Sequence, residues 1–439
     1  MCETSAPLSH EMGYNQPMDR TRVSTLWDNP DFVKLWAGQT VSKFGTHITG
    51  AAMAATAVLL LQATPAQMGL LGAFAGIPVL MISLLAGVWV DRLQRKRILI
   101  AADLGRAFLL LSIPLAALTG RLNMSQLYIV AALVGVLTVF YNVADQSFLP
   151  AVVARDKLVE ANARIGASEA LAEIAGPSLA GILVQWLSAP YAIFIDASSY
   201  FFSAASLGWI RVSEPPSVSP AHANVWHEMS DGLRVVTQQP ILRALMGTTA
   251  THTFFGNFIG TIYWLYLVRD LGLPPAIVGV SIGIGGIGAL LGTLLAERFA
   301  RRFGVGHTII GSLVIIPLWS GLLFLPLTTW SVSMVSGVFF VMQLMGDIFW
   351  SVFFINVVSL RQCLIPPHML GRASASLDFV GGGAGPIGAL VAGAVATAIG
   401  VRATWLVGAA GILAASLWLI FSPVRHLQVA PGEPASIPG

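Results

Sequence analysis

Charged residues are scarce along the whole chain. They make up 10% of its 439 residues, whereas hydrophobic residues make up 55%. A typical soluble domain carries about 25% charged residues. A water-soluble globular fold is therefore excluded, because most of the surface must face something other than water. We expect a protein that lies in a membrane for most of its length.

Several residues and motifs that form chemical sites are also missing. The two cysteines, Cys2 and Cys363, are too few for a disulfide framework or a metal cluster, and no GxxxxGK[ST] segment occurs. No cluster of metal ligands or nucleophiles is visible either. We therefore expect no metal, no cofactor, no nucleic-acid partner and no enzymatic activity.

Long apolar runs are abundant. A membrane-spanning helix needs about 20 largely apolar residues to cross a hydrocarbon core of about 30 Å. Twelve such runs occur, six on each side of a polar segment. The predicted fold class is an all-α polytopic membrane protein with twelve transmembrane helices in two six-helix bundles. The runs begin near Trp36, Gln67, Ile98, Gln126, Gly166, Pro190, Ile241, Ala276, His307, Ser331, Ala375 and Ala403.

Polar stretches mark the expected domain boundaries. The first 30 residues contain three prolines and lack the apolar segment of a secretory signal peptide. A second polar stretch contains Glu214-Pro215-Pro216 and continues as an amphipathic segment suited to the cytosolic leaflet. We expect a disordered cytosolic tail at 1–32, an N-terminal bundle at 33–212, a cytosolic linker with an amphipathic helix at 213–240, a C-terminal bundle at 241–424 and a cytosolic tail at 425–439.

The basic residues predict the orientation of the spans. With both termini in the cytosol, 19 of the 24 basic residues fall on the cytosolic side. Arg121, Arg269 and Arg402 fall outside, and Lys43 and Arg106 lie within spans. Basic residues concentrate in cytoplasmic loops, and one misplaced span would destroy this bias. The composition, rich in Arg, Ala and Gly, is typical of GC-rich bacteria, so we expect a multi-pass protein of the bacterial cytoplasmic membrane.

Two motifs recur with a similar separation. Asp91-Arg92 followed by Arg95-Lys96 has a counterpart about 206 residues later, Glu297-Arg298 followed by Arg301-Arg302. Gly176-Pro177 is repeated 209 residues later as Gly385-Pro386. Parallel six-helix repeats with a site at their interface are a known transporter plan. The sequence therefore indicates a duplicated six-helix unit.

These segments resemble the major facilitator superfamily. Gly87-x-x-x-Asp91-Arg92-x-x-Arg95-Lys96 resembles its cytosolic loop signature, and Gly176-Pro177-x-x-x-Gly181 is similar to the glycine–proline motif of its drug antiporters. More narrowly, the chain resembles the drug:proton antiporter-3 group, which includes macrolide and siderophore exporters. Segments 35–39, 103–106, 146–150, 160–163, 359–362 and 371–372 carry that likeness.

The resemblance implies a secondary active transporter that works by alternating access. We expect proton-coupled export of an amphipathic small molecule, such as an antibiotic, drug or siderophore, and hence a role in multidrug or antibiotic resistance. The expected partners are the substrate, protons and membrane lipids, with a monomeric protein. The alternative is a facilitated or differently coupled carrier, or an importer, of a small metabolite. The chain departs from the group at Thr46, where many relatives carry an acid, as well as at Gln94 and Val143.

The resemblance assigns two further roles. Asp91 would contact the positive N-terminal end of a helix in the second half and latch the two halves, whereas the plainer alternative for the neighbouring bases is that they only set topology. The conformational switch is expected at Gly87, Asp91, Arg92, Arg95, Lys96, Glu297 and Arg298. Close helix packing is expected at Gly176, Pro177, Gly181, Gly385 and Pro386.

Acidic residues within spans are costly and are candidates for proton coupling. Glu169 and Glu173 share a helix face, where one carboxylate raises the proton affinity of the other. Asp347 lies alone near the middle of a span, and Asp196 lies nearer the outer face. The structural alternatives are that Glu169 pairs with Arg164 or Arg372, and that Asp196 and Asp347 bond inside the bundle. Asp103 and Arg106, three residues apart, are expected to pair with each other.

The superfamily layout implies a central cavity beside the first span of each half. Lys43 and His47 share a helix face there and would attract an anionic group or pair with Asp347 across the cavity, although Lys43 has the reach to extend to the membrane interface instead. Neighbouring aromatic residues are divided between the cavity and the lipid. The expected cavity residues are Lys43, His47, Asn142, His252, Asn257, Trp264 and Asn356.

Overall fold

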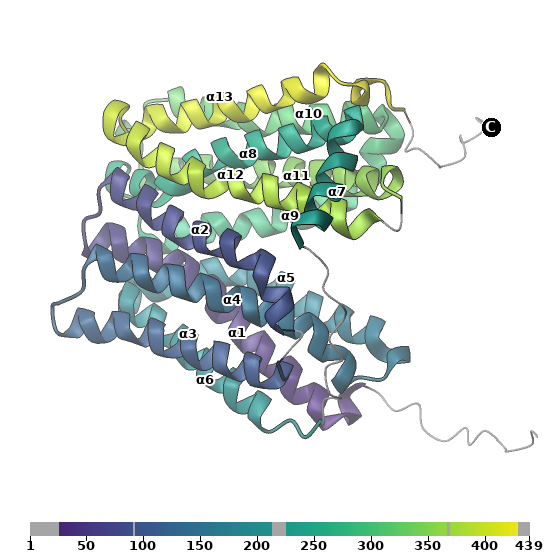
Figure 1. Ribbon diagram of the computed structural model, residues 1–439. Coiled ribbons are helices and arrows are strands. Elements are labelled where there is room, and N and C mark those ends of the chain that lie inside the picture. The colour runs from purple at the N-terminus through teal and green to yellow at the C-terminus, as the bar shows by residue number, and fades with distance from the viewer. Residues whose placement is uncertain (1–25, 91–92, 213–224, 367–368, 429–439) are drawn as a thin grey trace, which may run out of the picture.

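The computed structural model describes residues 26–90, 93–212, 225–366 and 369–428, and every regular element within these ranges is a helix (Figure 1). Six long helices precede residue 213: α1 (Pro30–Ala55), α2 (Pro65–Val90), α3 (Arg95–Leu118), α4 (Met124–Val152), α5 (Leu158–Leu187) and α6 (Ala189–Gly208). After the short α7 (Val225–Gln238) come α8 (Pro240–Trp264), α9 (Pro275–Phe303), α10 (Val305–Leu318), α11 (Val332–Leu364), α12 (Leu370–Ile399) and α13 (Val401–Ile420).

Local sequence explains where several helices begin and end. Asn29 caps α1 by accepting hydrogen bonds from the backbone N–H groups of Asp31 at 3.0 Å and Phe32 at 3.2 Å. Gly304 and Gly400 have φ angles of +81° and +86°, which let the chain turn directly from one helix into the next.

Regular structure lies at both expected tail boundaries. The 3₁₀ turn Leu26–Asp28 and the start of α1 fall within the segment 1–32, and Leu26 is buried. At the other end, a 3₁₀ turn covers Pro423–His426, and the backbone N–H of Gly306 donates to the carbonyl of Leu427 at 2.9 Å. The described residues on the far side of each expected boundary therefore pack onto the helices.

Nine helices of the described chain are long and apolar enough to cross a membrane. They are α2 to α5 and α9 to α13, with the turns that extend α5 and α10 included. The helices α1, α6 and α8 are 26, 20 and 25 residues long, but they carry more polar side chains. The polytopic, all-helical fold is thus confirmed.

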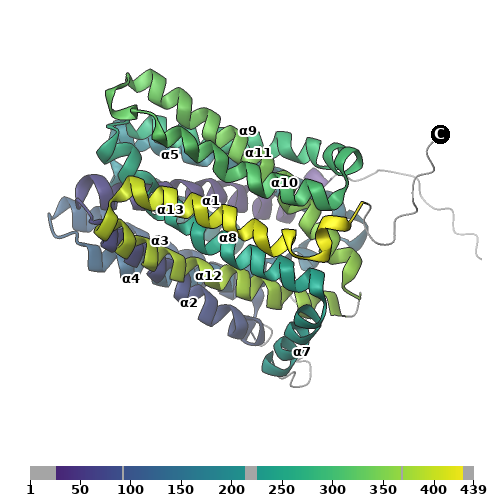
Figure 2. The ribbon, with the colours of Figure 1, turned by 90° about the horizontal axis from the view of Figure 1, so that it is seen from above.

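Helix packing repeats between the first and second parts of the chain. Helix α1 packs on α5 and α6, α3 packs on α4 and α6, and α2 packs on α4. In the same pattern, α8 packs on α12 and α13, α10 packs on α11 and α13, and α9 packs on α11. Figure 1 shows α1 to α6 below α7 to α13, and Figure 2 shows the same helices from above.

A second repeat appears at the ends of α1 and α8. Each helix continues into a π-helical turn, Thr56–Leu60 after α1 and Leu265–Asp270 after α8. The backbone N–H of Leu61 then bonds to the carbonyl of Thr56, and that of Leu271 bonds to the carbonyl of Tyr266. This local match supports a duplication, as the sequence motifs indicate.

Buried apolar side chains form three clusters that differ in which helices they join. One cluster draws only on residues 26–210 and another only on 236–424. The third contains residues of both parts, among them Met68 and Ala180 with Val278 and Ala396. This shared cluster lies at the end of the molecule that carries the loops 61–64 and 271–274. The two parts therefore share a core at one end and have separate cores at the other.

Glycines permit close contacts where the two parts meet. Helix α2 packs on α12, and α5 packs on α9. A Cβ on Gly69 would lie 2.9 Å from the Cα of Gly393, and a Cβ on Gly181 would lie 2.9 Å from the Cα of Gly279. Any larger residue would force the helices apart at either contact.

Helix α7 packs against α12 and α8. Val236 is fully buried, and Gly232 fits against the backbone of Arg372 with no space for a Cβ. Asp231 and Arg372 form an ion pair of 3.9 Å. The predicted amphipathic segment is therefore a helix attached to the second part of the chain.

Candidate functional site

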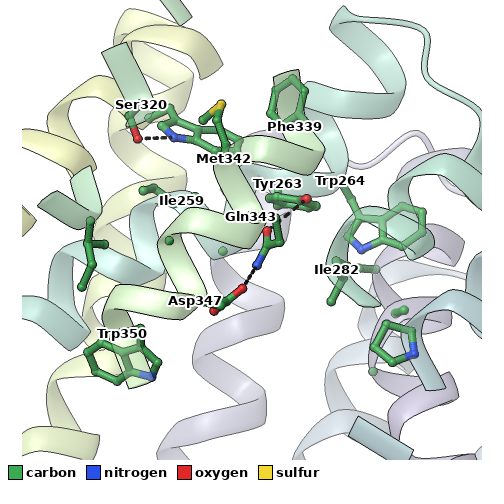
Figure 3. Close-up of a pocket in the computed structure, with 18 of the residues that line it drawn as sticks. Ile259, Tyr263, Trp264, Ile282, Ser320, Phe339, Met342, Gln343, Asp347 and Trp350 are labelled. Atoms are coloured by element: carbon green, nitrogen blue, oxygen red, sulfur yellow. Dashed lines mark hydrogen bonds between the residues drawn. The ribbon is translucent and has the colours of Figure 1, made fainter. Parts of the chain in front are cut away.

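A cavity of about 710 Å³ lies between the two parts of the chain (Figure 3). One wall comes from α1 and α5 and has small side chains such as Ala51, Ala54 and Pro177. The opposite wall comes from α8, α9, α10, α11, α13 and the turn after α10. That wall is largely aromatic, so the cavity suits a ligand with extensive apolar surface.

Helix α11 provides the longest row of lining residues. Its members recur at intervals of three or four and so share one helix face. Asp347 is the one acid in the lining and lies in this row. The row consists of Phe339, Met342, Gln343, Gly346, Asp347 and Trp350.

Asp347 ends a chain of hydrogen bonds that joins three helices (Figure 3). The side-chain amide of Gln343 donates to Oδ2 of Asp347 at 2.5 Å. The hydroxyl of Tyr263 on α8 donates to Oε1 of Gln343 at 3.5 Å and lies 3.0 Å from Oγ of Ser281 on α9. Gly285 of α9 is in close contact with the carboxylate, where a Cβ would collide with it. The carboxylate is thus fixed by a neutral donor and keeps its charge available to the cavity.

Aromatic rings line the same cavity as this carboxylate. The ring of His252 stacks on Trp350 with centroids 4.3 Å apart and an interplanar angle of 16°. Trp405 lies 5.7 Å from Tyr263 and 5.9 Å from Phe339 between ring centroids. Faces of such rings attract organic cations, which complements the negative charge of Asp347.

A ladder of ionisable groups runs along α1 and α5. Nζ of Lys43 lies 2.7 Å from Oε2 of Glu169. One turn further along both helices, His47 lines the cavity, and Glu173 lies within electrostatic reach of both His47 and Asp347. Within the described chain, Glu173 is exposed and makes no ion pair or hydrogen bond. Glu173 therefore interacts electrostatically with two residues that line the cavity, His47 and Asp347.

The predicted pairing of Asp347 with Lys43 or His47 is wrong. Gln343, four residues before Asp347 on the same helix face, is its hydrogen-bond partner. Lys43 contacts Glu169 instead, and it is not among the cavity-lining residues. Glu169 therefore pairs with neither arginine that the sequence suggested: Arg164 lies 3.8 Å from Glu160, and Arg372 pairs with Asp231.

Among the predicted cavity residues, His47, His252 and Trp264 line the cavity, whereas three asparagines do not. Asn257 and Asn356 bond to backbone carbonyls of their own helices, at 2.9 Å and 2.8 Å. Asn142 is exposed on α4, away from the cavity lining.

Asp196 lies in the core formed by α1, α3 and α6. It is fully buried and accepts a hydrogen bond from Ser199 at 3.0 Å. Gly45 packs directly on its carboxylate. Nearby, the predicted ion pair of Asp103 and Arg106 is confirmed, and the guanidinium lies 4.2 Å from the ring centroid of Tyr200.

Only some of the predicted switch residues lie within the described residues. Asp91 and Arg92 lie outside the described residues, and Gly87 lies within α2. Lys96 donates to the backbone carbonyls of Gly208 at 3.1 Å and Ile210 at 2.6 Å and so caps α6. Arg95 lies at the start of α3. The carboxylate of Glu297 lies 3.6 Å from Nε of Arg301, and Arg298 is exposed.

The predicted packing residues lie at helix contacts. Gly176 fits over the Cβ of His47, and Pro177 lines the cavity. Gly181 contacts α9, Gly385 faces Asn257 of α8, and Pro386 lies against Gly76 of α2.

Sequence reasoning missed several lining residues, namely Gln343, Met342, Phe339, Trp319 and Trp405. The first three could have been found, because they precede Asp347 by four, five and eight residues and belong to its helix face. The two tryptophans carry no such signal. Among the described residues, no group of three His, Cys, Asp or Glu side chains could hold a metal ion.

Comparisons with known proteins agree with this geometry. The family model of transmembrane secretion effectors, part of the major facilitator superfamily, matches residues 25–436. The multidrug efflux pump Tap of Mycolicibacterium fortuitum is 26% identical over 370 residues, which cover 82% of this chain and 88% of Tap. Macrolide efflux protein A of Streptococcus pyogenes is 24% identical over 273 residues, covering 62% of this chain and 67% of that protein.

Solved structures show the same fold at low identity. The nucleoside transporter NupG is 12% identical with a TM-score of 0.69, covering 89% of this chain and 98% of NupG. A bacterial homologue of the iron transporter ferroportin in its inward-facing state is 17% identical with a TM-score of 0.67, covering 89% and 98%. The chain therefore belongs to the transmembrane secretion effector family of the major facilitator superfamily and is a multi-pass membrane transporter, not an enzyme.

Proposed function

We propose that this protein is a proton-coupled exporter of amphipathic small molecules, such as antibiotics, drugs or siderophores, in the bacterial cytoplasmic membrane. The transport unit is a monomer of twelve transmembrane helices in two six-helix bundles, α1 to α6 and α8 to α13, with both termini in the cytosol. The efflux pumps among its relatives support the direction of transport. The distribution of 19 of 24 basic residues supports the orientation.

The observation that carries this proposal is the position of Asp347. An ionised carboxylate near the centre of a bilayer costs at least ~2.5–3.5 kcal/mol. Asp347 lies instead in a cavity that aromatic rings and His47 also line. Glu173 interacts electrostatically with both Asp347 and His47. A cationic group of the substrate or a proton can compensate the charge of Asp347. The substrate cation and the proton compete for the carboxylates of Asp347 and Glu173, and this competition couples export of the substrate to entry of the proton.

The separate and shared cores support alternating access. The shared core and the two glycine contacts lie at the end that the basic residues assign to the outside. The inward-facing ferroportin homologue matches with a TM-score of 0.67, whereas the outward-facing form matches with 0.54. We assign this structure to the inward-open state. Transport then requires the contacts α2–α12 and α5–α9 to open while the cytosolic ends close.

The cytosolic switch completes the proposal. Asp91, which lies outside the described residues, would latch the two bundles together in the outward-open state, as the resemblance implies. Gly87, Arg92, Arg95, Lys96, Glu297 and Arg298 belong to the same two loops. In this scheme, Lys96 also fixes the end of α6 through its two carbonyl contacts.

Transport into liposomes tests the proposal. Purified protein is reconstituted with its cytosolic side outward, and uptake of ethidium and of a macrolide antibiotic is followed with an acidic lumen. A proton-coupled exporter accumulates a probe only while the lumen is acidic, and a protonophore abolishes the accumulation. Equilibration that ignores the pH gradient would instead identify a facilitated carrier, and uptake driven by an alkaline lumen would identify coupling in the importing direction.

A further inference from the structure

Three glycines line the cavity, one on each of three helices. They are Gly50 of α1, Gly260 of α8 and Gly346 of α11. A Cβ built on any of the three would meet no heavy atom within 4 Å. Gly181 and Gly279 differ, because a Cβ there would collide with the facing helix. Helix packing therefore does not require glycine at the three cavity positions.

Glycine at these positions is unfavourable for the fold itself. In a helix interior, glycine destabilises by about 0.5–1 kcal/mol relative to alanine. Close approach of a neighbour usually compensates that cost, but no neighbour approaches here. The three glycines thus weaken their helices and leave bare backbone facing the cavity.

Gly260 and Gly346 each interrupt a row of larger lining residues, whereas Gly50 lies in the wall of small side chains. On α11, Gly346 lies between Gln343 and Trp350, and on α8, Gly260 lies between Ile259 and Tyr263. Gly50 and Gly260 are 210 residues apart, as are Gly69 and Gly279. They therefore occupy equivalent places in the two repeats.

We propose that Gly50, Gly260 and Gly346 set the largest substrate that the cavity admits. This inference rests on the proposed function, because it takes the cavity as the site that binds the transported molecule. Asp347 and the aromatic side chains supply attraction, whereas the three glycines supply the clearance for a bulky, multi-ring molecule. A side chain at any of these positions extends into the open cavity and reduces its volume.

Size-selective transport tests the inference. The variants Gly50→Leu, Gly260→Leu and Gly346→Leu are compared with the intact protein in liposomes, using a macrolide as the large probe and ethidium as the small one. We expect macrolide transport to fall about tenfold or more while ethidium transport stays within about twofold, since one methylene group in a pocket discriminates about 10- to 200-fold. The matched control is Gly337→Leu, because Gly337 is exposed on α11, has no neighbour for its Cβ and does not line the cavity.

The alanine variants guard against a folding defect. Alanine favours the helix over glycine, so Gly346→Ala should melt at the same or a higher temperature and still lower the ratio of macrolide to ethidium transport. An unchanged ratio in the alanine and leucine variants would overturn the inference, as would an equal loss of both probes in Gly346→Ala. If the intact protein moves neither probe, the proposed function fails first, and the size limit fails with it.

Discussion

Three carboxylates near the cavity differ in what surrounds them. Glu169 is held by Lys43, Asp347 accepts a hydrogen bond from Gln343, and Glu173 has no partner in the described chain. A partner that is already ionised stabilises the charged carboxylate and makes it a poor proton carrier. The role of each acid in coupling therefore follows from its contacts.

Glu173→Gln should uncouple transport from the proton gradient more severely than Glu169→Gln. Glu173 is exposed and makes no ion pair or hydrogen bond in the described chain, whereas Glu169 lies 2.7 Å from Lys43. Ethidium accumulation in liposomes with and without the pH gradient measures the coupling. Equal effects of the two substitutions, or full gradient dependence in Glu173→Gln, would contradict this assignment.

Asp347→Asn should weaken the binding of cationic substrates while leaving neutral ones unaffected. A hydrogen bond to a charged group contributes ~1.5–3 kcal/mol, so we expect affinity for ethidium to fall by about one to two powers of ten. Fluorescence titration in detergent measures the affinity, and thermal melting checks the fold.

A second substitution tests the partner of Asp347. Adding Lys43→Ala should not restore activity, because Lys43 pairs with Glu169 and not with Asp347. If Asp347 and Lys43 formed a pair across the cavity, the double variant would be more active than Asp347→Asn alone. Such a rise in activity would show that Asp347 and Lys43 meet in another state of the transporter.

The residues of the site were predictable to different degrees. The lone acid in a long apolar run indicated Asp347. Spacing put Lys43 and His47 on one helix face, and the resemblance placed both beside the cavity, whereas only His47 lines it. The partners were not predictable, because the contact between Lys43 and Glu169 depends on how α1 faces α5. Gln343 is neutral and therefore drew no attention, although its spacing from Asp347 was sufficient to identify it.

At the scale of helices, the contacts α2–α12 and α5–α9 join the two parts of the chain, and in the proposed inward-open state they close one side of the cavity. Both depend on a pair of glycines, Gly69 with Gly393 and Gly181 with Gly279. At the second contact, the side chain of Gln185 also accepts a hydrogen bond from the backbone N–H of Ala276 at 3.2 Å. These helices lie close enough that no side chain fits between them.

Gly279→Leu should shift the protein away from the observed state. Overpacking of a tight contact costs typically ~1–3 kcal/mol, which changes a conformational equilibrium about 5- to 150-fold. We expect transport to fall by a factor in that range without loss of folding. Gln62, in the loop after α1, and Arg269, in the π-helical turn after α8, are both exposed. Spin labels on Gln62→Cys and Arg269→Cys, with Cys2 and Cys363 replaced by serine, should move further apart.

The control for Gly279→Leu is Gly337→Leu, because a Cβ at Gly337 would have no heavy atom within 4 Å. It should change neither transport nor the distance between the labels. An unchanged label distance in Gly279→Leu, together with normal transport, would show that the α5–α9 contact does not act as a gate.

Hydropathy predicted the helices well but not all of their limits. Nine of the predicted spans meet a strict criterion of length and apolarity, whereas α1, α6 and α8 do not. These three helices carry polar residues, such as Lys43, Asp196 and His252, that neighbouring helices enclose. A criterion based on length and hydropathy disfavours helices with such polar side chains, even where those side chains face the protein interior.

At the scale of the whole molecule, the distribution of charge predicts a single topology. Arg121 and Arg269 are exposed in the loops after α3 and α8, on the side proposed to be outside. Cys363 and Arg298 are exposed near the C-terminal ends of α11 and α9, on the side proposed to be cytosolic. A membrane-impermeant maleimide can therefore test the arrangement of twelve spans in intact cells.

We expect Arg121→Cys and Arg269→Cys, each in a Cys2→Ser and Cys363→Ser background, to react in intact cells. The native Cys363 in a Cys2→Ser chain, and Arg298→Cys in the background that lacks both native cysteines, should react only after the membrane is permeabilised. The physical reason is that basic loops remain on the cytoplasmic side, and in the proposed arrangement of twelve spans each helix reverses the side of the next loop. An odd number of spans between two positions would place them on opposite sides of the membrane. If Arg121→Cys reacted in intact cells but Arg269→Cys reacted only after permeabilisation, the six-plus-six arrangement would be excluded. Reversal of all four labels would preserve that arrangement but place both termini outside, and it would assign the closed end of the cavity to the cytosol.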